Sequence, residues 1–341
     1  MQNIVTNTNL IQQKSARVFT ALPFSISFLL FCLLSALLIS WKPLQLSIAT
    51  VFLFAGPHNW MEFRFFLARV PLRWGKSKAF YTVGLGGVFV LTVAYLTLYW
   101  LGQSWYLNEN AWTISISIWN TLFLTWLSAL VWLRGKQSSK RDWSWVFAAG
   151  FALTAFAWAA PLWFSLILVY LHPLIALWFL DRQFKRTRPQ WRKAYHICLA
   201  ALPLILIVMW QQLANSPNLP DSDALSWRIT HHAGATILTS VSSHLLVATH
   251  VFLETVHYGV WIVLIPLVGL NAGIFEVKKI PFVAHREGWP MTVKTVLAFG
   301  VLIIFALWIC FWSNYTTTRD LYFALAMAHV LAEAPFLIRL I

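Results

Sequence analysis

Apolar stretches of about twenty residues recur along the whole chain, and this feature most strongly limits what it can fold into. A bilayer has a hydrocarbon core about 30 Å thick, which a helix of about 20 apolar residues can cross. Of the 341 residues, 59% are hydrophobic and 11% are charged, whereas soluble domains are about one quarter charged. This composition excludes a soluble enzyme and a disordered or fibrous chain. We therefore expect an all-α protein, a polytopic membrane helical bundle.

Ten of these stretches are predicted to be transmembrane helices. Together they make one integral membrane domain over 22–341, after a polar cytoplasmic N-terminal segment at 1–21. The eighth stretch is too long for one perpendicular crossing and contains Pro266, so a long tilted helix and a broken helix both stay open. The ten predicted stretches are 22–41, 44–67, 80–102, 112–133, 144–160, 161–180, 197–214, 236–270, 293–312 and 319–341.

Basic residues gather in alternate loops and account for the net charge of +14. Cytoplasmic loops of membrane proteins carry an excess of Lys and Arg, and ten spans with both termini cytoplasmic place every basic cluster on that side. We therefore expect a multi-pass protein of a bacterial inner membrane or thylakoid, in contact with membrane lipid and with no nucleic-acid partner. The clusters lie at 64–78, 134–141, 182–193 and 278–286, whereas the loops 103–111, 215–228 and 313–318 hold a single basic residue, Arg228.

Three histidine–glutamate pairs lie within the apolar stretches. An ionisable group inside a membrane costs several kcal/mol and is therefore a functional candidate by default. The chain has six glutamates, and each of the three inside a span follows a histidine by four residues. Because positions i and i+4 share one face of a helix, each pair presents a nitrogen and a carboxylate to the same neighbour. The pairs are His58 and Glu62, His250 and Glu254, and His329 and Glu333.

Two further histidines extend this pattern. His257 follows Glu254 by three residues, and Glu-x-x-His is the spacing of helical di-iron carboxylate sites. His172 lies in the middle of the sixth stretch. The predicted topology makes the second, sixth, eighth and tenth stretches parallel, so we expect their histidines to converge at one depth, with each glutamate about one turn nearer the cytoplasm. The converging set is predicted to be His58, His172, His250 and His329, with His257 as a further ligand.

This donor set predicts a metal site. Imidazole and carboxylate without thiolate suit iron, manganese or zinc, and non-haem iron is the usual choice for oxygen chemistry. We expect one or two Fe(II) ions, with the carboxylates of Glu62, Glu254 and Glu333 as direct ligands or as partners that fix the imidazole tautomers. The alternative for each pair is a structural hydrogen bond. His231 and His232 are interpreted as interfacial residues, and His244 as lying off the ligand face.

At these residues the chain resembles the Brp/Blh family, membrane-embedded iron-dependent enzymes that cleave β-carotene to retinal. The stretch 56–58, Gly-Pro-His, with Glu62 four residues after the histidine, is similar to an early family motif, and we expect its proline to break or kink the helix. The stretch 158–172 resembles the helix that enters the third family histidine, and 329–333 resembles the terminal histidine and acid. Ala176 stands where the family has a second histidine of a His-x-x-x-His pair.

The resemblance and the histidines together favour one function and leave two others open. The favoured function is an Fe(II)-dependent oxygenase that acts with O2 on a carotenoid or another lipid-soluble polyene, with oxidative cleavage to an apocarotenal or retinal as one outcome. The metal supplies the oxygen chemistry and the protein a dry apolar slot. A transporter or an ion or proton relay that uses the His–Glu pairs is the alternative, although no internal repeat supports it. An intramembrane hydrolase is the third hypothesis.

Overall fold

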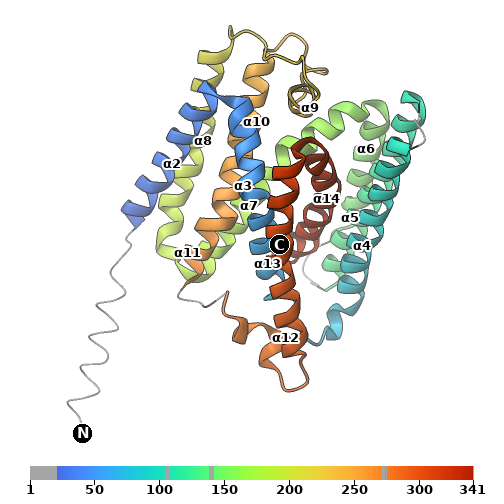
Figure 1. The fold of residues 1–341 in the computed structure, drawn as a ribbon. Helices are drawn as coiled ribbons and strands as arrows, with labels where there is room; N and C mark the ends of the chain where they lie inside the picture. Colours follow the sequence, from blue (N-terminus) through green and yellow to red (C-terminus); the bar gives the residue numbers. More distant parts are fainter. Residues whose placement is uncertain (1–20, 105–107, 138–141, 271–272, 274, 341) are drawn as a thin grey trace, which may run out of the picture.

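The protein is described here by a computed structural model, which covers residues 21–104, 108–137, 142–270, 273 and 275–340. Within these ranges all regular secondary structure is helical, and the helices pack into one bundle (Figure 1). Apart from Ala21, the predicted polar segment 1–21 lies outside the described residues. The all-α prediction is therefore confirmed for the part of the chain that the structure covers.

Every predicted apolar stretch contains a helix. Two short helices, α9 (Ala224–His232) and α12 (Pro281–Ala284), lie in the connections between the long ones. The long helices are α2 (Ala21–Trp41), α3 (Pro43–Leu67), α4 (Lys78–Ser104), α5 (Glu109–Lys136), α6 (Trp145–Ala159), α7 (Pro161–Thr187), α8 (Arg192–Leu213), α10 (Ser243–Gly259) with its extension α11 (Ile265–Gly269), α13 (Pro290–Ser313) and α14 (Tyr315–Leu340).

Eight of these helical segments are long and apolar enough to cross a membrane. The two others among the ten predicted spans are α3 and α6. Helix α6 has 15 residues and is too short, whereas α3 has 25 residues but carries polar side chains in its second half, including His58, Glu62 and Arg64. The polar half of α3 is the part that enters the site described below.

Proline positions explain several helix boundaries. Proline lacks a backbone N–H and has a fixed φ angle that suits the first turn of a helix, and Pro43, Pro161 and Pro290 each begin one. Pro57 behaves differently from the predicted break, because α3 continues through it from Pro43 to Leu67. The helix packs closely against α13 at this point, since a Cβ atom on Gly56 would lie 3.3 Å from Leu307.

The eighth predicted stretch is one continuous helical segment, but a shorter one than expected. Residues 233–242 form turns, and the helix begins only at Ser243. A π-helical turn, η3 (Val260–Leu264), joins α10 to α11 directly before Pro266. The missing N–H of Pro266 would interrupt a regular α-helical ladder, and the wider turn lets the segment continue to Gly269.

Helices α3, α7, α10 and α14 meet in the interior of the bundle. Helix α10 packs against α2, α3, α7 and α8, and α14 packs against α3, α4 and α13. In Figure 1, α2 and α8 lie on one side of this group and α4, α5 and α6 on the other. The four inner helices are those that the histidine pattern selected, so the site lies between them.

Candidate metal centre

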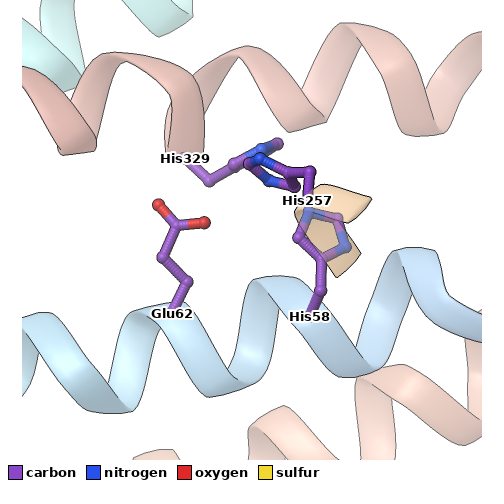
Figure 2. Close-up of side chains that lie close together, drawn as sticks. All are labelled: His58, Glu62, His257 and His329. Carbon is purple, nitrogen blue, oxygen red and sulfur yellow. The ribbon is translucent and has the colours of Figure 1, made fainter. Parts of the chain in front are cut away.

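Three imidazoles and one carboxylate meet between α3, α10 and α14 (Figure 2). His58 and Glu62 come from α3, His257 from α10 and His329 from α14, and one ligand atom of each lies within 4.8 Å of all the others. Two ligands on opposite sides of one metal ion are about 4.2 Å apart, since each bond is about 2.1 Å long. Four ligand atoms cannot all be opposite one another, and those of a tetrahedral ion are about 3.4 Å apart at the same bond length. The most widely separated of the four atoms would therefore have to approach by about 1.4 Å to share one ion.

Backbone carbonyls fix the tautomers of two of these imidazoles. Nδ1 of His58 donates to the carbonyl oxygen of Phe54 at 3.0 Å, and Nδ1 of His257 donates to that of Pro173 at 3.3 Å. A carbonyl can only accept, so the proton is on Nδ1 and the lone pair on Nε2 in both neutral rings. Metal-bound histidines characteristically hold their second nitrogen in this way. Both rings therefore offer Nε2 as a ligand atom.

Buried polar atoms without a hydrogen-bond partner are concentrated at this site. Among the described residues, sixteen buried side-chain nitrogen and oxygen atoms lack a partner, and eight of them belong to five residues of this region. Buried polar groups are nearly always hydrogen-bonded, so each exception calls for an explanation. The eight atoms are both carboxylate oxygens of Glu62 and Glu333, both ring nitrogens of His329, Nε2 of His257 and Nδ1 of His172.

His172 and Glu333 extend the group on the side of α7. The His172 ring lies 4.8 Å from the His257 ring and 5.3 Å from the His329 ring, measured between centroids. Its Nδ1 is 3.1 Å from Oε2 of Glu333, at ion-pair distance. The four histidines and two glutamates, His58, Glu62, His172, His257, His329 and Glu333, are hereafter called the metal centre.

An aromatic layer closes the metal centre on one side. Trp261 is fully buried, and its ring contacts those of Phe65 at 5.2 Å and Phe179 at 5.4 Å. Phe66 stacks on Phe336 at 4.3 Å between centroids. These residues follow the metal-centre residues by about one turn on α3, on α14 and from α10 into η3, and by two turns on α7. They exclude water from the end of the centre where Glu62 and Glu333 lie.

The predicted convergence of His250 with the other histidines is wrong. His250 and His257 share a helix face, but seven residues separate them by about 10 Å along the axis, and it is His257 that reaches the metal centre. The His250 ring instead lies 5.0 Å from that of His232 and 5.8 Å from that of Tyr170. Glu254 stays with it, since its Oε2 is 3.6 Å from Nδ1 of His250.

His232 makes contacts within the bundle that were not predicted. It is half-buried at the end of α9, and its ring contacts both His250 and Phe323, the latter at 5.2 Å. We call His232, His250 and Glu254 the second polar group. His231 is exposed, and His244 faces away from both groups, because its Nε2 donates to the carbonyl of Ser40 at 2.8 Å.

One charged residue near the second polar group was missed from the sequence. Arg319 is 6% exposed, its guanidinium lies over the Phe323 ring at 4.6 Å, and its Nε has no partner. The neighbouring Asp320 forms an ion pair with Arg228 of α9. The signal was present in the sequence, because an arginine at the start of a predicted span, opposite the basic loops, departs from the usual charge distribution.

No family model, no curated protein and no solved structure matches this chain. The resemblance noted in the sequence therefore stays a prediction. What the chain binds has to be argued from the geometry of the metal centre and from the chemistry of its donor atoms.

Proposed function

We propose that the chain is an integral membrane protein that holds non-haem Fe(II) at the metal centre and oxidises a lipid-soluble substrate with O2. A carotenoid or another polyene is the substrate class that the sequence resemblance favours. The observation that carries the proposal is a group of eight buried nitrogen and oxygen atoms without a hydrogen bond, which belong to five residues of the metal centre. Two of them, Nδ1 of His172 and Oε2 of Glu333, lie 3.1 Å apart as an ion pair. Eight helical segments suited to crossing a bilayer support the membrane location, and the basic loops favour cytoplasmic termini in a bacterial inner membrane or thylakoid.

A purely structural role accounts poorly for this group. Leaving a buried polar group unsatisfied costs about 1–3 kcal/mol, and the cost recurs at several side chains packed around one point. A hydrogen-bonded network would be expected to satisfy these atoms with one another. Instead, the two imidazoles whose tautomers are fixed both offer Nε2, and Glu62 points across the gap towards α14 (Figure 2).

The donor chemistry favours iron over softer metals. The metal centre offers imidazole nitrogen and carboxylate oxygen only, and Cys32, Cys198 and Cys310 are not part of it. Ligands of this kind suit non-haem iron, with manganese and zinc as the other candidates. Fe(II) bound here would supply the redox chemistry with O2. His58, His257 and His329 with Glu62 would hold the ion, and His172 and Glu333 would act as additional ligands or orient the others.

The surrounding residues would control what reaches the site. The aromatic layer of Trp261, Phe65, Phe66, Phe179 and Phe336 keeps water from the carboxylate end. The ring of Tyr258 packs on that of His58 at 4.5 Å and covers a further side. The side chain of His172 is 21% exposed, compared with 1% for Glu333. His172 is therefore the more exposed of these two side chains.

An ion or proton relay is the second candidate function, and the second polar group favours it. His232, His250 and Glu254 continue the line of ionisable side chains along α10, on the side opposite the aromatic layer. Chains of His and Glu across a membrane are typical of proton and ion pathways. A relay would bind metal weakly or not at all at the metal centre, and this difference separates the two candidates.

Elemental analysis of the purified protein tests the proposal most directly. We expect stoichiometric iron in the wild-type chain and its loss in the His58→Ala and His329→Ala variants. His250→Ala is the matched control, because it removes an intramembrane histidine outside the metal centre and should leave the iron content unchanged. Correctly folded wild-type protein without metal would refute the proposal. Expression in a carotenoid-producing host, with loss of pigment as the readout, then tests the substrate class.

A further inference from the structure

An apolar hollow of ≈ 200 Å³ opens between α7, α8 and α10. Its floor includes Pro173, Phe252 and Val256, which are all buried, and its rim includes the exposed Leu174 and Pro203. The described residues that line it are all proline, leucine, phenylalanine or valine. Both α7 and α8 are long and apolar enough to cross a membrane, so the hollow opens onto lipid. We call this hollow the lateral groove.

The lateral groove shares a wall with the metal centre. Pro173 and Val256 of its floor are the chain neighbours of His172 and His257. The contact is also direct, because the carbonyl of Pro173 accepts the hydrogen bond from Nδ1 of His257 at 3.3 Å. Pro173 therefore lies between the groove and the His257 imidazole.

The walls determine what kind of group can lie in the groove. No lining side chain can donate or accept a hydrogen bond, and burying a polar group without a partner costs free energy. The α8 wall extends from Leu199 to Leu206, which is about 10 Å along the helix axis. Sites for whole drug-sized ligands are about 300–1,000 Å³. The groove is thus suited to one segment of a hydrocarbon chain, with the rest of the molecule in the lipid.

We propose that the lateral groove binds the hydrocarbon chain of the substrate from the bilayer, beside the His257 imidazole of the metal centre. The inference rests on the proposed oxidation of a lipid-soluble substrate, and it adds the place where that substrate binds. The chain would lie between Pro173 and Pro203, two prolines within helices. A substrate with a polar group on this segment would be rejected, since the walls offer that group no partner.

Photo-crosslinking in phosphatidylcholine nanodiscs tests this inference without an activity assay. The probe is hexadecanol carrying a diazirine in its chain, and the labelled peptides are mapped by mass spectrometry. We expect labelling to concentrate on α7, α8 and α10 around the groove, about tenfold above other lipid-facing helices, and to be competed by excess hexadecanol. Leu206→Trp at the half-buried rim should fill the groove and abolish the competed labelling, and Leu202→Trp on the floor should do the same.

A second apolar hollow supplies the matched control. It lies between α12, α13 and the end of α3, where Val296 is a lining residue. Val296→Trp should leave the labelling of the lateral groove unchanged. The iron content is measured on every sample. It should be equal in Leu206→Trp and the wild type, because the substitution changes neither the helices that carry the ligands nor the tautomers of their imidazoles.

The outcomes separate the groove from the metal. Labelling that is spread evenly over the lipid-facing helices and is not reduced by excess hexadecanol would mean that ordinary acyl chains fill the groove. This result would overturn the inference even if iron is bound. Competed labelling that persists in both tryptophan variants would overturn it as well. Competed labelling at the groove in metal-free wild-type protein would support the hydrocarbon site and refute the proposed function alone.

Discussion

Replacement of Glu62 by methionine should have opposite effects on the metal-free and the metal-loaded protein. Glu62 is fully buried, and neither of its carboxylate oxygens has a partner among the described residues. Methionine has a similar length and is apolar. In the metal-free protein, Glu62→Met removes an unsatisfied group that costs about 1–3 kcal/mol, so the variant should unfold at a temperature a few degrees higher than the wild type.

In the loaded protein the same substitution removes a ligand. A bound ion stabilises the folded chain by about 2.7 kcal/mol when its free concentration is 100 times the dissociation constant. Loss of affinity in Glu62→Met would remove this contribution. Thermal unfolding in detergent, followed by circular dichroism with added Fe(II) under anaerobic conditions or with a chelator, measures both effects. We expect the variant to be more stable than the wild type with chelator and less stable with iron.

Glu254→Met is the matched control for this experiment. Glu254 belongs to the second polar group and lies 3.6 Å from Nδ1 of His250, so its removal should destabilise the protein equally with iron and with chelator. If Glu62→Met instead destabilises the chain to the same extent in both conditions, Glu62 is a structural carboxyl group. The unpartnered oxygens of Glu62 would then not indicate a metal ligand.

Further expectations concern packing and the loop before α9. A Cβ atom on Gly87 would clash with the Trp126 indole, whereas one on Gly86 meets nothing within 4 Å. Gly87→Ala should therefore lower the yield of folded protein, and Gly86→Ala should not. Size-exclusion profiles of the two variants measure this difference. Asp223 caps α9, and the hydroxyl and backbone N–H of Ser226 hold the pKa of its carboxyl below the usual range. Because this pKa is lowered on folding, the cap stabilises α9 above the ordinary carboxyl pKa and is lost as pH falls through the lowered value. Hydrogen exchange in α9 should therefore be faster in Asp223→Ala than in the wild type at neutral pH. In acid the exchange rates of the variant and the wild type should become equal. A difference that persists in acid would contradict the role of the Asp223 carboxylate as the cap.

The sequence predicted the helices well because hydrophobic length and proline placement are local properties. The boundary between α6 and α7 falls at Pro161, as predicted, since a proline can begin a helix but rarely continue one. The predicted start of the eighth stretch at 236 was wrong by seven residues. Residues 233–242 are apolar enough to resemble a span, but they form turns at the end of the bundle, and hydropathy alone does not distinguish these two outcomes.

The site was predicted by helix face but not by depth. Helical spacing places His250 and His257 on one face, and nothing in the spacing says which of them is level with His58 and His329. That depends on how far neighbouring helices are shifted along their axes, which side-chain packing decides. The same limit explains His232, because its contact with His250 is made by the short helix α9 folding back over the bundle. The fixed tautomers and the unpartnered atoms appear only in three dimensions.

The π-helical turn at Val260–Leu264 has a consequence for how this chain tolerates change. A turn of this kind contains one residue more than an α-helical turn, and such bulges occur frequently at functional sites. Loss of a single residue between 260 and 264 could be absorbed by tightening to a regular turn, whereas a deletion between 250 and 257 would rotate one histidine by about 100° against the other. A change of chain length at this turn therefore affects the residues that follow it, whereas His257, which precedes it, keeps its orientation.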